Sequence, residues 1–318
     1  MSGQVAVRGA LPASTSRRSL SGRVRKVLKR PQFWFGLLVL VPAVVWYAIF
    51  QWGPIVQGLF YAFNDYNFAD PSKTRFIGFQ NFIMVTKHFL FPIATKNTFV
   101  YAIEVWAITF PLSLITAVAL VSVKKGRAFF QFAIFMPVVV SLVAMALMFK
   151  QLLDPDTGLL NAFLRSLHLP EGKWLTDERS AMPTVAAIDS WKILGTYVVL
   201  LAAGLLNIPP EIYDAALVDG ANSWQTFWKI TLPLLQHVMV LVITMLLIFG
   251  LQMFISGTLL PRTPGGPGYA TTVLTIWLYN EAFGNWRFGF ASAISMTLFL
   301  IVFILTLIQM RIRPDWEY

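Results

Sequence analysis

Hydrophobic positions along the chain fall into long, uninterrupted runs. Runs of membrane-spanning length lie near 32–52, 97–121, 128–150, 183–206, 235–256 and 289–310. A helix needs about 20 apolar residues to cross a bilayer, whereas the strands of a spanning β-barrel alternate with a period of two. The pattern therefore predicts an all-α integral membrane protein with six transmembrane helices.

Composition agrees with a membrane protein. Hydrophobic residues make up 57% of the 318 residues and charged residues 13%, which is well outside the balance of water-soluble domains. Cysteine is absent, which excludes disulfides, thiolate nucleophiles and Cys-ligated metals. The three histidines, His88, His168 and His237, form no short ligand pair, so no metal site is expected.

Basic residues predict the orientation of the chain, because Lys and Arg are retained on the cytoplasmic side. The tail 1–31 carries eight of them, and Lys124, Lys125, Arg127, Lys229, Arg311 and Arg313 fall on the same side of the predicted spans. Both termini are therefore expected in the cytoplasm. The basic tail lacks the interleaved aromatics of nucleic-acid modules and is expected to face membrane lipid.

Two segments are expected outside the cell. Segment 53–96 is rich in aromatics and turn residues and is expected to form a cap of short helices. Segment 151–182 contains Asp154-Pro155-Asp156-Thr157-Gly158, which has the chemistry of a turn and lacks the ligand spacing of a calcium loop.

The segment 207–233, predicted to be cytoplasmic, reads as two short helices joined by a sharp turn. Pro210 suits a helix start, and Gly220 suits the left-handed residue that closes a helix. Asn222 followed three residues later by Gln225 resembles a capping box. We expect a rigid elbow.

The first helix of this elbow is expected to expose a face for a partner. Ala215 and Ala216 are small enough to permit close approach, and Ile212 and Asp219 lie on the same general side. Such a helix could enter a groove on another protein. The alternative, a helix pair lying on lipid, fits less well because interfacial helices are normally basic.

At this elbow the sequence resembles a known family. Asp214-Ala215-Ala216, then Gly220, then Ile230-Thr231-Leu232-Pro233 is similar in type and spacing to the EAA signature of permease subunits of bacterial ATP-binding-cassette (ABC) importers. The one departure is Asp214, where the family usually has Glu. The resemblance implies that the ATPase-coupling residues are Asp214, Ala215, Ala216, Gly220, Ile230, Leu232 and Pro233.

A second resemblance indicates the substrate class. Thr263-Pro264-Gly265-Gly266-Pro267, followed by Thr271 or Thr272 and by Tyr279 to Phe283, is similar to the T-x-GGP region of carbohydrate-importer permeases of the maltose and glycerol-phosphate type. The same glycines could suggest a phosphate-binding loop, but no Lys-Ser or Lys-Thr follows them.

The resemblance implies a subunit of a larger complex. The sequence contains no Walker A motif, so ATP and Mg²⁺ are expected on a separate ATPase, and this chain is not expected to be an enzyme or to bind a cofactor. The implied partners are a second, related permease in a heterodimer, two cytosolic ATPase subunits and an extracytoplasmic sugar-binding protein. The implied location is the bacterial inner membrane.

Sugar recognition needs hydroxyl partners and an aromatic platform near the midplane of the membrane. Tyr197 and Gln252, on the spans that flank the elbow, are candidate polar contacts, and Trp191 or Phe249 could stack on a pyranose ring. Ordinary helix packing is the alternative explanation for each.

Charges within the predicted spans leave other functions open. Glu104, Asp189 and Lys192 could form a structural ion-pair network, line an outward vestibule, or relay protons in an ion-coupled secondary transporter. An integral-membrane enzyme acting on lipid-linked sugar could use Asp214 and Asp219. These two acids are five residues apart on one helix and point in different directions.

Overall fold

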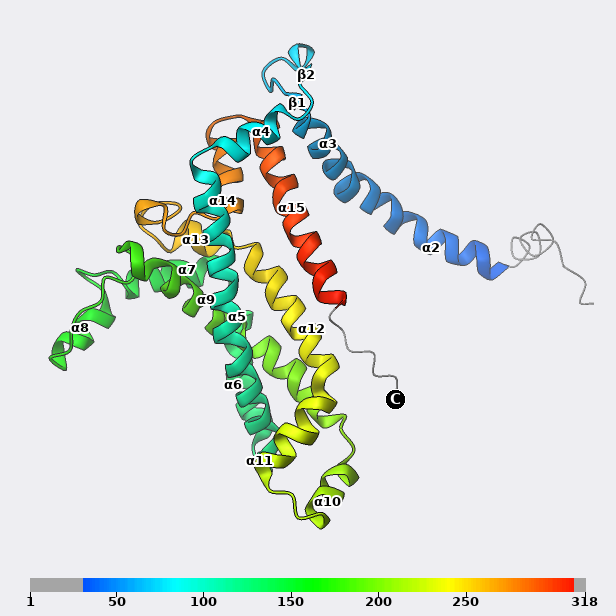
Figure 1. The fold of residues 1–318 in the computed structure, drawn as a ribbon, viewed down its shortest axis with the longest axis vertical. Coiled ribbons are helices and arrows are strands. Elements are labelled where there is room, and N and C mark those ends of the chain that lie inside the picture. Colours follow the sequence, from blue (N-terminus) through cyan, green and yellow to red (C-terminus); the bar gives the residue numbers. More distant parts are fainter. Residues whose placement is uncertain (1–30, 312–318) are drawn as a thin grey trace, which may run out of the picture. The chain divides into compact units, whose positions relative to one another are not determined.

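The computed structural model describes residues 31–311, so the basic tail up to Arg30, together with Arg313, lies outside the described residues. The chain divides into two compact units after Gln57, and each is described by itself. Within the described range the structure is almost entirely helical, as the apolar runs predict (Figure 1).

The first unit contains α2 (Pro31–Tyr47), the π-helical turn η1 (Ala48–Trp52) and the start of α3 (Gly53–Ala62). The apolar helix runs from Trp34 to Ala62, ten residues beyond the predicted end of the first span. Pro54 follows the π-helical turn η1 directly, and the helix continues past it into α3.

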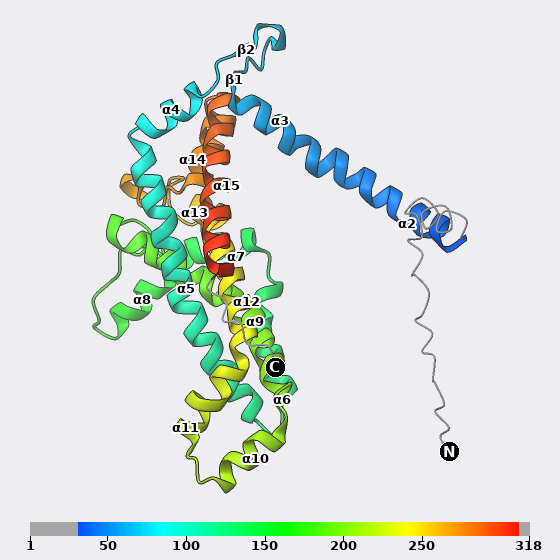
Figure 2. The same cartoon turned by 45° about the vertical axis from the view of Figure 1, so that its right-hand side comes forward.

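The second unit is built around α5 (Leu90–Ser122), α9 (Glu178–Leu206) and α12 (Leu232–Leu251), which pack along one another (Figure 2). α15 (Phe288–Arg311) completes the set of long helices. Close approach requires glycine at two contacts. A Cβ on Gly195 would lie 2.5 Å from the carbonyl oxygen of Ile134, and one on Gly250 would lie 2.7 Å from the Cα of Ala102.

The predicted span 128–150 is a bent pair of helices rather than one rod. α6 (Arg127–Val139) and α7 (Leu142–Leu152) meet at an angle of 90°, so the described chain has five long apolar helices, or six spans if the bent pair counts as one. A break leaves the last carbonyls of α6 without helical partners. Lys192 of α9 provides a hydrogen-bond donor for this region. Its ammonium donates to the carbonyls of Pro137, Val138 and Val140 at 3.4, 3.1 and 2.8 Å.

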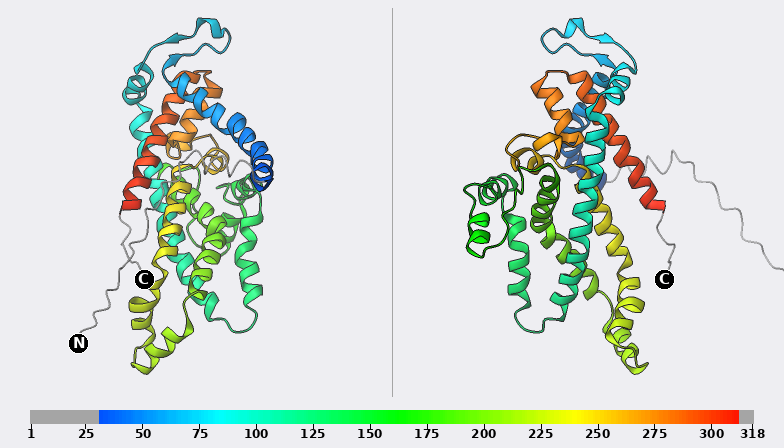
Figure 3. Two further views of the ribbon diagram at one scale, coloured as in Figure 1. Left: turned by 90° about the vertical axis from the view of Figure 1, so that its right-hand side faces the viewer. Right: turned by 60° about the vertical axis from the view of Figure 1, so that its left-hand side comes forward.

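Short elements gather at the two ends of the second unit. One end carries the hairpin of β1 (Asn64–Asp65) and β2 (Arg75–Phe76), with Asn64 opposite Phe76, followed by α4 (Gln80–Lys87). The opposite end carries α10 (Pro210–Val218) and α11 (Ser223–Thr226), as all views show (Figure 3). The segment 53–96, expected to be a cap of short helices, thus contains α3, the turn η2 (Pro71–Lys73), α4 and the start of α5, and also a hairpin.

Further short elements connect the long helices. They are the 3₁₀ turn η2 (Pro71–Lys73), α8 (Leu159–Ser166), the π turn η3 (Phe227–Thr231), α13 (Ile255–Leu259), the 3₁₀ turn η4 (Pro267–Tyr269), α14 (Leu274–Tyr279) and the π turn η5 (Asn280–Gly284).

Candidate functional site

The turn that ends α10 is fixed by its own backbone. Gly220 adopts a φ of +74°, and its N–H donates to the carbonyl of Leu217 at 3.1 Å. The N–H of Ala221 donates to the carbonyl of Ala216 at 2.9 Å. These two bonds around a left-handed glycine are a Schellman motif, so the predicted role of Gly220 as the closing residue is confirmed.

The start of α11 is fixed by side chains. The N–H of Gln225 donates to Oδ1 of Asn222 at 2.9 Å, and the N–H of Asn222 donates to Oε1 of Gln225 at 3.0 Å, which confirms the predicted capping box. The hydroxyls of Tyr213 and Thr231 lie 3.4 Å apart and connect α10 to the turn that leads into α12. The segment is therefore stiff because local bonds hold both of its bends.

The exposed face of this elbow differs from the predicted one. Ala216 is 5% exposed and Ile212 is half-buried, so both point toward the chain itself. The residues that face outward are Asp214, Ala215, Val218, Asp219, Trp224 and Trp228, with Val218 88% and Trp224 70% exposed. Leu217 is also exposed, but it borders the inner side of the elbow. Helical spacing alone could not decide which side of α10 packs against α5 and α9.

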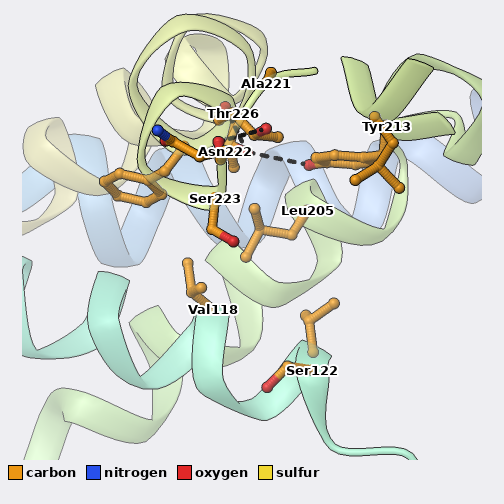
Figure 4. Close-up of a pocket in the computed structure, with 12 residues that line it drawn as sticks. Val118, Ser122, Leu205, Tyr213, Ala221, Asn222, Ser223 and Thr226 are labelled. Atoms are coloured by element: carbon orange, nitrogen blue, oxygen red, sulfur yellow. Dashed lines mark hydrogen bonds between the residues drawn. The ribbon is translucent and has the colours of Figure 1, made fainter. Parts of the chain in front are cut away.

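The inner side of the elbow encloses a pocket of about 640 Å³ (Figure 4). Val118 and Ser122 from the end of α5 and Leu205 from the end of α9 form its floor, and Tyr213 and Asn222 of the elbow lie across it. The elbow thus stands off the helix ends and touches them through few side chains. The remaining predicted coupling residues lie at its junction with α12, with Ile230 and Leu232 half-buried and Pro233 exposed.

The glycine-rich loop lies at the other end of the second unit and is tightly packed. The hydroxyl of Thr272 donates to the carbonyl of Gly265 at 3.1 Å, and Nδ2 of Asn97 donates to the carbonyls of Tyr269 and Thr272 at 2.9 and 3.0 Å. A Cβ on Gly266 would lie 2.7 Å from Oγ1 of Thr271. The loop therefore joins α13 to α14 and also ties both to α5.

The four predicted substrate contacts do not share one cavity in this conformation. Gln252 is exposed at the end of α12, and Phe249 is half-buried one turn before it. Trp191 is 45% exposed and borders a pocket of about 540 Å³ between α7 and α9, with its ring 5.5 Å from that of Phe149. Tyr197 is 5% exposed in the core, so a sugar could reach it only if α9 moved.

Asp189 and Lys192 have separate partners, and Oε2 of Glu104 is buried without a hydrogen-bond partner in the described structure. Oδ2 of Asp189 accepts a hydrogen bond from the hydroxyl of Tyr101, and Asp189 is 1% exposed. Lys192, one turn later, is engaged with the carbonyls at the break between α6 and α7. No ion pair joins Asp189 to Lys192 within the described structure. Pro137 within the run 128–150 is a local signal for a break, but nothing in the sequence indicates that Lys192 would bind the carbonyls there.

The loop after α7 is the predicted turn. Oδ1 of Asp154 accepts from the backbone N–H groups of Asp156 and Thr157, both at 3.0 Å, and the guanidinium of Arg262 lies 3.0 Å from both Asp154 and Asp156. The hydrogen bond from Thr157 and the guanidinium lower the pKa of Asp154 to about 2. This latch joins the loop after α7 to the loop after α13.

Solved structures share this fold. The chain resembles a permease chain of a bacterial ABC transporter involved in the import of the acidic polysaccharide alginate, with a TM-score of 0.79 and 26% identity over 92% of this chain and 100% of that one. A chain of a bacterial alginate ABC transporter in complex with an alginate pentasaccharide-bound periplasmic protein aligns with a TM-score of 0.78 and 24% identity over 91% and 95%.

Sequence relatives agree with the structural ones. The probable ABC transporter permease protein YurN of Bacillus subtilis is 34% identical over 86% of this chain and 94% of its own length. The multiple sugar-binding transport system permease protein MsmF of Streptococcus mutans is 31% identical over 92% and 99%. Residues 109–317 match the family model described as binding-protein-dependent transport system inner membrane component. The chain therefore belongs to that family, the multi-pass inner-membrane permease subunits of ABC transporters, which are not enzymes.

Proposed function

We propose that this chain forms part of the translocation pathway for a sugar or oligosaccharide delivered by an extracytoplasmic binding protein. Family membership carries the proposal, and relatives named for multiple sugars and for arabinooligosaccharides support carbohydrate as the substrate class. The complex would contain a second, related permease and two cytosolic ATPase subunits that hold ATP and Mg²⁺. Of the two alternatives, an ion-coupled transporter and a membrane enzyme, neither matches the family.

The elbow is the proposed contact with the ATPase. Asp214 and Ala215 would touch the partner directly, together with the exposed Val218 and Trp224, since all four point away from the chain. Ala216 would act indirectly, because its side chain is buried and cannot touch a partner. A stiff elbow can pass a rigid-body movement of the ATPase to the spans.

The remaining predicted coupling residues would set the direction of that movement. Gly220 shapes the turn, and Ile230, Leu232 and Pro233 connect the elbow to α12. Gln252 and Phe249, the proposed sugar contacts on this helix, lie at the end of α12 far from the elbow. Trp191 and Tyr197 would join them only in a conformation in which α9 has shifted.

Capture of the ATPase tests the proposed contact. We expect the purified complex to retain the ATPase with the wild-type chain and to lose it with Val218→Asp combined with Trp224→Asp, since both side chains are exposed and their replacement leaves the core intact. The matched control is Leu159→Asp on α8, which is 72% exposed at a distance from the elbow. Equal retention by all three proteins would contradict the proposal.

The absence of cysteine makes the proposed sidedness easy to test. In intact cells, a membrane-impermeant maleimide should label Asp156→Cys on the outer loop, and should label Asp214→Cys only after the membrane is permeabilised. Asp156 is 77% exposed in its side chain and Asp214 is also exposed, so only the membrane should make the two cysteines differ in their labelling by the maleimide. Labelling of Asp214→Cys in intact cells would place the elbow outside the cell and would contradict the proposal that it contacts the ATPase.

A further inference from the structure

A series of aromatic rings runs from the end of α12 to the hairpin. Successive rings are those of Phe254 and Tyr279 at 4.9 Å between centroids, Tyr279 and Phe283 at 4.9 Å, Phe283 and Phe288 at 6.0 Å, Phe288 and Phe68 at 5.2 Å, and Phe68 and Trp286 at 5.1 Å. We call these six residues the aromatic track. Its inner end begins two residues after Gln252, a proposed sugar contact.

Most of the aromatic track is open rather than packed. Tyr279 is 43% exposed, and Phe283, Trp286 and Phe68 are 58%, 58% and 55% exposed. Core aromatics are normally covered, so these rings do not belong to the core of this chain. The rings come from three separate parts of the chain, namely the start of α13, the α14–η5–α15 region and the loop after β1.

The backbone holds Trp286 outward at a cost. Trp286 has a φ of +56°, a conformation that side chains other than glycine rarely adopt. The turn is held by hydrogen bonds from the N–H of Arg287 to the carbonyl of Glu281 at 2.8 Å and from the N–H of Asn285 to that of Asn280 at 2.9 Å. Such strain persists where the surroundings over-determine it, often at functional sites.

Polar pockets accompany the outer end of the aromatic track. Two cavities of about 430 and 390 Å³ are both lined by Asp65, Tyr66 and Trp286. Each volume falls within the range of small-molecule sites, roughly 300–1,000 Å³. Aromatic faces beside carboxylate, amide and hydroxyl groups are the combination that binds the apolar face and the hydroxyl edge of a sugar.

The two cations that line these cavities, Lys73 and Arg287, are paired within the chain. The ammonium of Lys73 lies 3.1 Å from the carboxylate of Asp70, and the guanidinium of Arg287 lies 3.3 Å from that of Glu281 and 4.3 Å from the ring centre of Phe290. An acidic ligand would need a free cation, so paired cations favour an uncharged one.

We propose that the aromatic track is an entry path for a neutral oligosaccharide, along which successive sugar rings stack before they reach Gln252. Successive ring centroids lie 4.9 to 6.0 Å apart, so the rings offer closely spaced contacts to a ligand that moves along them. The inference rests on the proposed carbohydrate transport and adds a chain-length preference to it. A belt of aromatics at the membrane surface would bind lipid headgroups singly and would show no such preference.

The test compares two double variants in the reconstituted complex. One is Phe283→Leu with Trp286→Leu, and the control is Phe299→Leu with Phe303→Leu, whose rings lie on α15 outside the aromatic track and are 59% and 49% exposed. The probes are radiolabelled maltose, cellobiose and xylobiose and the pentamers of the same three series. Size-exclusion chromatography shows whether each complex is intact, and Phe68→Leu provides a second, milder variant.

We expect the track variant to take up the pentamer roughly five- to tenfold more slowly and the dimer less than about twofold more slowly, since an aromatic contact contributes about 0.5–1.5 kcal/mol and 1.4 kcal/mol is tenfold. Equal losses for dimer and pentamer, accompanied by loss of ATPase stimulation by the binding protein, would overturn the inference in favour of a docking surface. Equal losses in the control would indicate a membrane belt. Preferential uptake of oligogalacturonate would overturn the neutral assignment.

Failure of the proposed function gives a different result. If the wild-type complex takes up no carbohydrate at all, the proposed substrate class is wrong, and the inferred entry path for an oligosaccharide is then also wrong. If the wild type transports a neutral pentamer and the track variant matches the control, only the entry path is wrong.

Discussion

Two glycine turns at opposite ends of the second unit solve different problems. At Gly220 a Cβ would have no other atom within 4 Å, and the turn is held by bonds between neighbouring residues. At Gly265 an added Cβ would clash with the hydroxyl of Thr272, and at Gly266 it would lie 2.7 Å from that of Thr271. This outer loop is also bonded to Asn97 of α5.

The elbow, which we call the joint, is shaped by bonds between neighbouring residues. The glycine-rich loop, which we call the fastening, is shaped by contacts with distant helices. The elbow keeps its shape by itself and leaves its outward face free for a partner, which is what a lever needs. The glycine-rich loop takes its shape from α5 and α13, so it fixes helices that are far apart in the sequence. Substitutions in the glycine-rich loop should therefore impair the folding of this subunit. Substitutions in the elbow should impair its coupling to the ATPase.

Gly266→Ala should have the largest effect on stability. It adds a Cβ at a φ of +77° and 2.7 Å from Oγ1 of Thr271, so strain and overpacking together should lower the free energy of unfolding by about 3 kcal/mol. Thermal unfolding of the purified permease in detergent measures the loss.

Gly126→Ala is the matched control for Gly266→Ala. Gly126 has the same φ of +77° and nothing within 4 Å, so its replacement adds the backbone strain without the clash. It should cost about 1–2 kcal/mol. If the two variants lose equal stability, tertiary packing does not distinguish the outer loop from an open turn.

Sequence patterns predicted the local bends and missed the tertiary ones. The helix stop at Gly220 and the capping box at Asn222 depend on bonds within a few residues, so residue type and spacing were sufficient. At the break within 128–150, Pro137 is a local signal, but the bonding partner Lys192 lies more than fifty positions away, and no local pattern reports such a partner. The buried side of α10 was also missed, because helical spacing shows which residues share a face but not which face packs.

The same limit applies to the candidate site. Gln252 and Trp191 were found as polar or aromatic residues on spans, and both are exposed, whereas Tyr197 was chosen by the same reasoning and is buried. The aromatic track went unnoticed because its rings come from segments that only the fold brings together. A single sequence thus reveals family motifs and local turns, and contacts between distant segments need the structure.

Lys192→Met tests whether the bend between α6 and α7 needs a residue that is distant in the sequence. The substitution removes three hydrogen bonds from a charged donor and leaves the carbonyls of Pro137, Val138 and Val140 without it. Bonds to charged groups contribute about 1.5–3 kcal/mol, and partial replacement by water or neighbouring groups should limit the net loss to about 2 kcal/mol. Thermal unfolding and limited proteolysis at the break measure it.

Lys150→Met, on the neighbouring helix α7, is the control for Lys192→Met, because Lys150 is also half-buried and makes no contact with these carbonyls. Lys192→Arg should recover part of the loss, since the guanidinium keeps the charge and several donors but has a different shape. Stability of Lys192→Met equal to that of Lys150→Met would show that the break holds without the ammonium.

Gly220→Val should have the smallest effect on stability and a large effect on transport. A β-branched residue at a φ of +74° costs about 1–2 kcal/mol locally, and the exposed turn can relax to avoid most of that cost without disturbing the spans. Relaxation would redirect α10 relative to α11, so uptake by the complete complex should be lost while membrane insertion and folding remain. Gly220→Asn, which tolerates the left-handed conformation, should retain uptake because it keeps the direction of the turn. Normal uptake by Gly220→Val would show that transport does not require a stiff elbow. The proposed contrast between the elbow and the glycine-rich loop would then be wrong for the elbow.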